Sequence, residues 1–334
     1  MKIRWQRLLA HCERSTLRVL GITTLMLCCL AAAAQSYPDK PIRFVVPMAP
    51  GGAVDSVSRA VAHALSKKMG QPVVVDNKPG AGGSIAAGFV SNAAPDGYTV
   101  FVADTGQLSI NPFLYKKLPY DTSKGFVAVT DAVAAPLYLA VNADLPIKTV
   151  QELIAYAKTA KEPLAYGSVG VGSVHHLGME LLVSKTGIKA THIPFKGASQ
   201  SAVALASGEV QMALSAMPSL KPLVAAGKVR ILGVTTPQRV AQTPEVPTVS
   251  ESGISGFSVA VNVGFVLPPN TPEAIVTALY RDMSDVLANP EVQTQLTTMG
   301  LVMLKSNPRD YANAIKDDAD KYRALIKSTG AVAE

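Results

Sequence analysis

The chain has 334 residues, of which 48% are hydrophobic and 16% charged, a balance that is typical of a folded globular protein and excludes a disordered chain. Its net charge of +7 is concentrated at the N-terminus, where the first 34 residues carry five Lys or Arg and one Glu. The remaining 26 basic and 23 acidic residues give a net charge of only +3, which argues against nucleic acid as a partner.

Residues 1–34 have the layout of a secretory signal peptide. A basic stretch ends at Arg18, the apolar run Val19–Leu30 follows, and Ala31–Ala34 form a small-residue tail. The apolar run is shorter than the roughly 20 residues that a helix needs to cross a bilayer. All three cysteines lie in this segment, so the exported chain would contain no disulfide and no Cys-ligated metal. We therefore expect a periplasmic protein.

After the leader, short apolar runs alternate with longer amphipathic stretches. The predicted strands are Ile42–Val46, Pro72–Asp76, Thr99–Ala103, Leu137–Val141, Leu164–Gly167, Thr191–Ile193, Met212–Leu214, Ile231–Thr235 and Val259–Val266. The predicted helices are Asp55–Met69, Ser84–Asn92, Thr149–Ala160, Ser173–Thr186, Ala198–Ser207, Pro218–Ala226, Pro272–Ala288 and Pro308–Ser328. This alternation predicts an α/β fold of mainly parallel sheets with helices on both faces. Ala135–Val141 and Ser258–Gly264 are predicted to be extended crossings between two lobes.

Proline and glycine mark three helix ends. Pro272 after Thr271 and Pro308 after Asn307 each predict a first-turn proline behind an N-cap residue. Gly70 after Met69 predicts a glycine C-cap.

Four glycine-containing loops leave a predicted strand and lead to a predicted helix. We number them first (47–55), second (77–84), third (167–173) and fourth (194–199). Glycine lets main-chain N–H groups approach a ligand closely, and a helix N-terminus adds unpaired donors with a partial positive charge. Because ligands of α/β sheets bind beyond the carboxyl ends of the strands, four such loops predict a cleft for a small anion.

Nucleotide and hydrolase motifs are absent from the sequence. It contains no G-x-x-x-x-G-K-[ST], no G-x-G-x-x-G and no G-x-S-x-G. Ser168 and Ser173 could in principle use His175, His176 or His192 as a base, so an exported hydrolase remains an alternative, although no nucleophile elbow presents either serine. His176 and Glu180 have the spacing of two metal ligands on a helix, but without a third ligand we interpret them as a surface hydrogen-bonded pair. We expect no cofactor, no metal and no catalytic residues.

The order of these motifs resembles the Bordetella uptake gene (Bug) family, the periplasmic substrate-binding proteins of tripartite tricarboxylate transporters. The matching phrases are Tyr37–Arg43, Val46–Asp55, Val74–Gly83, Ala94–Thr99, Ile110–Pro112, Leu118–Asp121, Tyr166–Ser173, Pro194–Gly197, Gly227–Arg230 and Val246–Thr248. The resemblance extends over essentially all of residues 37–330.

The resemblance implies a two-lobed periplasmic-binding-protein fold with the ligand cleft between the lobes. One lobe would comprise 35–137 plus 260–334 and the other 138–259. It further implies a non-enzymatic, monomeric protein that binds a small carboxylate and delivers it to a membrane permease of a tripartite tricarboxylate-type transporter, or alternatively signals to a membrane sensor. The ligand-binding residues that the family motifs carry over to this chain are Met48, Ala49, Gly51, Gly52, Thr105, Ser168, Gly172 and Ser173.

Two positions depart from the family pattern. Ser215 stands where many members have Asp, and Asn262 stands where members often have an aromatic residue. We include Ser215 among the predicted ligand-binding residues. Because its hydroxyl carries no charge to pair with an ammonium group, the sequence favours a mono- or dicarboxylate, with an aromatic acid or an amino acid as further possibilities. Asp55 is interpreted as a helix-start residue, since an acidic side chain would repel an acid ligand.

Overall fold

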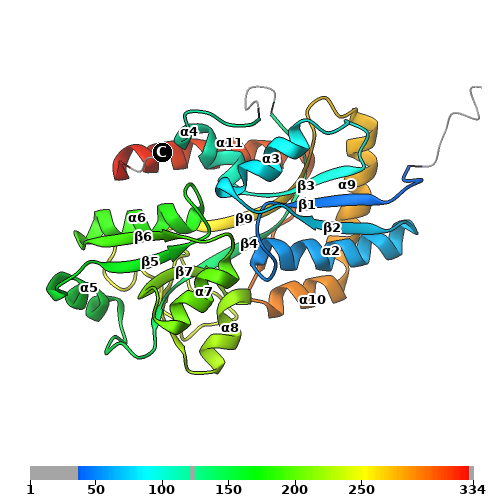
Figure 1. The fold of residues 1–334 in the computed structure, drawn as a ribbon. Coiled ribbons are helices and arrows are strands. Elements are labelled where there is room, and N and C mark those ends of the chain that lie inside the picture. Colours follow the sequence, from blue (N-terminus) through cyan, green and yellow to red (C-terminus); the bar gives the residue numbers. More distant parts are fainter. Residues whose placement is uncertain (1–36, 121–124, 331–334) are drawn as a thin grey trace, which may run out of the picture. The chain divides into compact units, whose positions relative to one another are not determined.

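Two sheets that share one long strand organise the structure, a computed structural model that describes residues 37–120 and 125–330 (Figure 1). The predicted signal peptide of residues 1–34 lies outside the described residues. The first sheet has the order β2–β1–β3–β9–β4, and the second continues from the same strand as β4–β7–β5–β6. We call the parts built on these sheets the first lobe and the second lobe.

The first sheet combines parallel and antiparallel strands. It contains β1 (Ile42–Val46), β2 (Val73–Asn77), β3 (Thr99–Asp104), β9 (Ala260–Leu267), the start of β4 (Val127–Asn142) and the short β10 (Val302–Met303). Strand β1 is parallel to both β2 and β3, whereas β9 runs antiparallel to β3 and β4.

The second sheet repeats this arrangement. It contains β5 (Leu164–Ser168), β6 (Ala190–Pro194), β7 (Met212–Ala216) and β8 (Val229–Val234), with the end of β4. Strand β5 is parallel to both β6 and β7, and β7 and β8 run antiparallel to β4. The expected parallel pairing therefore holds among the three strands at the outer part of each sheet.

Each sheet has a point where the chain reverses the direction in which it adds strands. From β1 the chain passes through α2 (Ala53–Met69) to β2 and then through α3 (Ser84–Ser91) back to β3, on the other side of β1. Figure 1 shows α2 and α3 on opposite faces of the sheet, as right-handed crossovers require. In the second lobe α6 (Val174–Thr186) and α7 (Ala198–Ser207) connect β5, β6 and β7 in the same way. The carboxyl ends of β1 and β3, and those of β5 and β7, are thus the places where ligands bind in such sheets.

Strand β4 is longer than the sequence predicted. The predicted strand Leu137–Val141 is only its last part, which pairs with β7, while residues 127–136 pair with β9. The earlier residues are mostly Ala and Val interrupted by Asp131 and Pro136, so they form no continuous apolar run. Pairing with β9 nevertheless draws them into the sheet, with register shifts on either side of Asp131.

The other helices cover the two sheets. They are α4 (Asn111–Leu114), α5 (Val150–Thr159), α8 (Met217–Ala225), α9 (Glu273–Ala288), α10 (Pro290–Thr298) and α11 (Pro308–Thr329), with short turns η1 (Ala81–Gly83) and η2 (Gly106–Ile110). Helices α4 and α10 are not among the predicted helices. The predicted caps at Gly70 and Asn307 are confirmed, since Gly70 is left-handed and the Asn307 side chain accepts the Asp310 N–H. The predicted cap at Thr271 is wrong: its hydroxyl donates to the Pro268 carbonyl, and α9 starts at Glu273.

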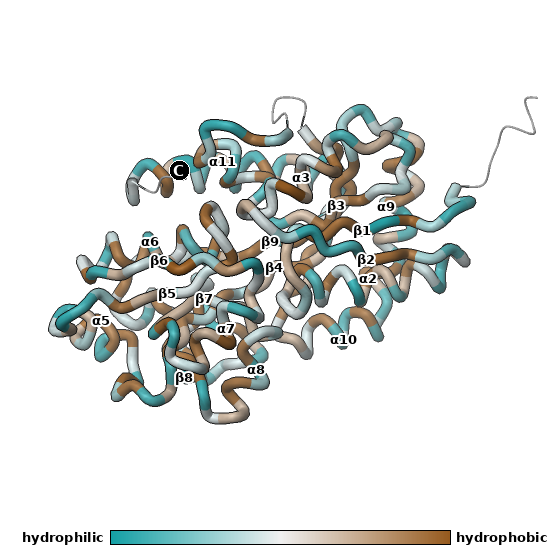
Figure 2. Tube along the Cα trace, in the orientation of Figure 1, coloured by the Kyte–Doolittle hydropathy of each residue, from teal (hydrophilic) through white to brown (hydrophobic). Residues whose placement is uncertain are grey.

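Large apolar side chains fill the space between strands and helices. Phe44 of β1 and Phe265 of β9 are fully buried with ring centroids 5.3 Å apart, and Tyr138 and Tyr166 are fully buried in the second lobe. Figure 2 shows strongly hydrophobic stretches along the strands of the first sheet. Burying each such side chain contributes about 1.5–3 kcal/mol, which holds the strand ends, and the loops that follow them, in fixed positions.

Candidate functional site

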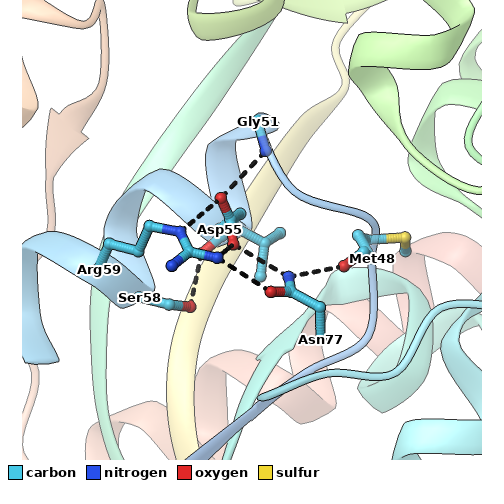
Figure 3. A network of polar contacts seen from close by, with 7 residues as sticks. Met48, Gly51, Asp55, Ser58, Arg59 and Asn77 are labelled. Atoms are coloured by element: carbon cyan, nitrogen blue, oxygen red, sulfur yellow. Dashed lines mark hydrogen bonds and ion pairs between the residues drawn. The ribbon is translucent and has the colours of Figure 1, made fainter. Parts of the chain in front are cut away.

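The first loop is held by a buried carboxylate network (Figure 3). The Asn77 side chain donates to the Met48 carbonyl at 2.9 Å, and the Gly51 N–H donates to Asp55 at 3.0 Å. Asn77 also donates to Asp55 at 2.9 Å, which ties the loop to the start of α2 from two sides. At Gly51 φ is +93°, a left-handed conformation that favours glycine.

Asp55 holds the first loop in place, and its negative charge is balanced by a neighbouring cation. The Arg59 guanidinium lies one helical turn away and forms an ion pair with it at 3.0 Å. Burial alone would raise the pKa of the Asp55 carboxyl, but hydrogen bonds from Arg59, the Gly51 N–H and Asn77 outweigh burial and hold that pKa below its usual value. The prediction that Asp55 is a helix-start residue is confirmed by its place in the first turn of α2.

The first loop contacts the fourth loop of the opposite lobe. The Ala49 N–H donates to the Lys196 carbonyl at 3.1 Å, and the Ser219 hydroxyl of α8 approaches the Gly51 carbonyl at 3.4 Å. A Cβ at Gly197 would come within 2.9 Å of the Ala49 Cβ, so glycine is needed for this close approach. The two lobes are therefore in direct contact at their strand ends.

Two helix N-termini from opposite lobes meet at this contact. Gly52 is the N-cap of α2 and Gly197 the N-cap of α7, and neither supplies a side-chain acceptor for the first helical N–H groups. A Cβ at Gly52 would lie 3.5 Å from the Ala198 Cβ, which places the two helix starts side by side. Unpaired N–H groups and the helix dipole both favour an anion here.

The third loop is fixed by serine and histidine side chains. The Ser168 hydroxyl accepts the Gly170 N–H at 3.0 Å and lies 2.6 Å from His192 Nε2. Ser173 caps α6 by accepting the His176 N–H at 3.2 Å, and its hydroxyl donates to the Gly170 carbonyl at 2.7 Å. Both serines therefore hold the loop in shape while their neighbours present main-chain groups.

His176, His192 and Tyr166 lie against one another beneath the third loop. The two imidazoles are stacked with centroids 4.2 Å apart, and Tyr166 stacks on His192 at 5.0 Å. Burial lowers the pKa of His176 and His192 to about 4, so both rings are neutral at pH 7. The interpretation of His176 and Glu180 as a surface hydrogen-bonded pair is wrong, because His176 is buried and Glu180 accepts the Tyr166 hydroxyl.

The second and third loops form a further contact between the lobes. The Tyr115 hydroxyl of the first lobe donates to the Val171 carbonyl at 2.7 Å. The Asn111 side chain donates to the Gly82 carbonyl at 3.2 Å, while its own carbonyl oxygen is buried without a partner among the described residues. A Cβ at Gly172 would lie 2.7 Å from that oxygen, so the third loop approaches Asn111 closely.

The nine predicted residues all stand at or just beyond the carboxyl ends of β1, β3, β5 and β7. Six of them contact the opposite lobe through these loops: Met48, Ala49, Gly51 and Gly52 of the first loop meet the third and fourth loops, and Gly172 and Ser173 face Gly106, which is next to Thr105. Thr105 accepts the Asn262 N–H at 3.0 Å. Ser215 near the end of β7 is buried, with an unpartnered hydroxyl among the described residues, and leads into α8, whose Ser219 approaches Gly51.

A pocket of about 690 Å³ opens between the lobes, and its lining was not predicted from the sequence. Gly80, Ala81, Gly82 and Tyr115 line it from the first lobe, and residues 169–171, His176, His192 and 194–196 line it from the second lobe. None of the nine predicted residues lines this pocket. The four predicted loops could have indicated it, because the second, third and fourth loops each contribute to the wall.

The described part of the chain gives no sign of a metal centre or a membrane span. Within residues 37–120 and 125–330, no three His, Cys, Asp or Glu side chains are grouped so that they could hold a metal ion. No helix in the same residues has the length and apolar character needed to cross a bilayer.

A family model described as the tripartite tricarboxylate transporter family receptor matches residues 57–331. The chain belongs to this receptor family. Three solved structures are similar to it over nearly their whole length. The periplasmic binding protein BugD is 31% identical with a TM-score of 0.85, covering 89% of this chain and 100% of BugD. Rhodopseudomonas palustris Rpa4515 with adipate is 32% identical with a TM-score of 0.86, covering 89% of this chain and 99% of Rpa4515. MatC from the same organism with bound malate is 30% identical with a TM-score of 0.82, covering 87% of this chain and 100% of MatC.

As a receptor of this family, the chain has the two-lobed periplasmic-binding-protein fold. The Ser168–His192 pair has a structural role in this fold. Ser168 is fully buried and already accepts a main-chain N–H, so its hydroxyl holds the third loop. A nucleophile would instead have to face the substrate, and its histidine would need an orienting partner.

Proposed function

We propose that the chain is a periplasmic solute-binding protein that closes two lobes on a small carboxylate and delivers it to the permease of a tripartite tricarboxylate-type transporter. The lobes would comprise 35–137 plus 260–334 and 138–259, and residues 1–34 would direct export. The observation that carries this proposal is the meeting of the four strand ends, two from each lobe, at which all nine predicted ligand residues stand. The protein would act by binding alone, without catalysis.

The chemistry of this junction suits a carboxylate. The starts of α2 and α7 bring unpaired N–H groups from both lobes. The charge of the nearby Asp55 is balanced by Arg59, and Asn77 donates a hydrogen bond to it. Adipate in Rpa4515 and malate in MatC are both small carboxylates, which supports the same ligand class here. Ser215 offers an uncharged hydroxyl, so a mono- or dicarboxylate is favoured over an amino acid.

The ligand class can be tested with matched acids and amides. We would titrate adipate, malate, a tricarboxylate and the corresponding uncharged amides into residues 35–334 by calorimetry, with dye-based thermal shift as a screen. A ligand at a hundred times its Kd adds about 2.7 kcal/mol of stability, which raises Tm by several degrees. Binding of an acid but not of its amide is the expected result. Equal binding of acid and amide, or binding of neither, would refute the proposal.

Two buried serines provide a matched pair of variants. Ser215 and Ser201 both have a buried hydroxyl without a partner among the described residues, but only Ser215 stands at the proposed site. Ser215→Ala should weaken carboxylate binding about tenfold, because it removes a hydrogen bond to a charged group, and should leave the free protein as stable as before. Ser201→Ala should change neither property. Equal effects of both variants would remove Ser215 from the site.

A further inference from the structure

The pocket of about 690 Å³ between the lobes has the size of a small-molecule site. It is formed by loops that follow β2, β5 and β6, and so lies to one side of the strand ends at which the nine predicted residues stand. Because its wall comes from both lobes, a molecule that fills it contacts both lobes.

Planar rings form much of the wall. Tyr115 contributes from the first lobe, and His176, His192 and Phe195 contribute from the second. The two imidazoles stack on each other, and His192 also stacks on the buried Tyr166, so these rings are held rigidly in place. A flat aromatic molecule gains from contact with such rings beyond the burial of its area.

The only charged side chain in the lining is Lys196. Its ammonium group makes no hydrogen bond or ion pair with the residues that the structure describes. The two histidines are neutral at pH 7 because burial lowers their pKa to about 4. Lys196 is exposed, whereas Gly197 and Ala198, which follow it, are buried against the first loop and do not line the pocket. The pocket therefore combines planar rings with one positive charge that has no partner among the described residues.

The wall also contains a strained residue. Ala81 has φ of +47° although it is not glycine, and only one other non-glycine residue of the described chain, Asn270, has a positive φ. Such a conformation is unfavourable for a residue with a Cβ and tends to occur where a site requires a particular backbone shape. Here it places the second loop opposite the third, with Gly82 close to the Val171 carbonyl.

We propose that this pocket binds the ring of an aromatic carboxylate whose carboxylate group lies at Lys196. The inference rests on the proposed function and narrows it from small carboxylates in general to aromatic ones. Tyr115 and the second loop cover the ring from one lobe, while Phe195, His192 and His176 cover it from the other. The bound ring then bridges the lobes and favours their contact.

The test compares two acids of the same charge and similar size. Benzoate and cyclohexanecarboxylate are titrated by calorimetry into residues 35–334, with adipate and malate in parallel. Stacking on the ring-lined wall should make benzoate bind about fivefold more tightly than cyclohexanecarboxylate. Lys196→Met should weaken benzoate binding about fivefold or more. Lys189 is an exposed lysine of the same lobe outside the pocket, and Lys189→Met should not change benzoate binding. Phe195→Leu should reduce the preference for benzoate.

Each outcome separates the inference from the function on which it rests. A preference for benzoate that depends on Lys196 and Phe195 supports the inference. Binding of adipate or malate without any binding of benzoate overturns the inference and leaves the proposed function standing. Equal binding of benzoate and cyclohexanecarboxylate, or equal effects of the Lys196 and Lys189 variants, also overturns it. Binding of no carboxylate at all contradicts both.

Discussion

Replacing Asp55 with alanine should destabilise the protein and loosen the first loop together. The carboxylate of Asp55 receives hydrogen bonds from Gly51 at 3.0 Å, Asn77 at 2.9 Å and Arg59 at 3.0 Å. Breaking a fully buried ion pair by removing one partner costs about 3–5 kcal/mol. The Arg59 side chain is 53% exposed and regains hydration, so we expect about 2–3 kcal/mol for Asp55→Ala.

Thermal unfolding measures this loss directly. At about 2 °C per kcal/mol for a chain of this size, Tm should fall by roughly 4–6 °C at pH 7. Asp320→Ala breaks an exposed ion pair with Arg323 and should lower Tm by less than about 1 °C. Carboxylate binding should weaken in Asp55→Ala as well, because Gly51 loses its tether. A Tm within 1 °C of the parent at pH 7 would refute the network as drawn in Figure 3.

The loss of Tm in Asp55→Ala should depend on pH. The pKa of Asp55 is lowered in the folded state, so its stabilising contribution is present above the pKa of the unfolded chain and is lost as pH falls through the folded-state pKa. The difference in Tm between parent and Asp55→Ala should therefore be largest near neutral pH and should close in acid. A difference that grew as pH fell would contradict this sign.

Two further substitutions test other parts of the account. Tyr115→Phe removes a hydrogen bond that joins the lobes, so carboxylate affinity should fall about threefold to tenfold with little change in the Tm of the free protein. The control Tyr280→Phe should leave both affinity and Tm unchanged. An unchanged affinity in Tyr115→Phe would mean that this hydrogen bond does not contribute to closure of the lobes. Burial raises the pKa of the Asp104 carboxyl in the folded protein to about 6. The contribution of Asp104 to folding stability is therefore fully present below the pKa of the unfolded chain and is lost as pH rises through about 6. Asp104→Asn should therefore raise Tm at pH 8, by an amount equivalent to about 3 kcal/mol, and have little effect at pH 4. A lower Tm at pH 8 would show that the Gly106 N–H requires a charged acceptor.

The strand ends and glycine loops could be predicted from the sequence because local chemistry determines them. An apolar run followed by glycine and an N-terminal helix pattern marks the end of β1 whatever the rest of the chain does. The same holds for the third loop, where Ser173 is both a predicted site residue and the N-cap of α6. Six of the nine predicted residues contact the opposite lobe at these loops, because parallel crossovers bring strand ends to one edge of each sheet.

The contacts between the lobes could not be predicted, since they depend on which distant loops meet. Tyr115 and Val171 are 56 residues apart, and nothing near either residue indicates that they pair. The start of β4 was missed for a similar reason: its pairing with β9, far along the chain, overrides a weak local preference for a strand. The ring-lined pocket combines both difficulties, because His176 and His192 are neighbours only after β5, β6 and α6 have packed.

The central claim is that a carboxylate binds between the two lobes and holds them closed, and distance measurement between spin labels tests it most directly. All three cysteines lie in residues 1–34, so residues 35–334 offer a background without thiols. Lys117→Cys in the first lobe and Lys189→Cys in the second, both exposed, would carry the labels. Saturation with the tightest-binding carboxylate should shorten and narrow the distance distribution, while its uncharged amide should leave the distribution unchanged. Identical distributions with and without a carboxylate whose binding calorimetry has established would contradict the claim.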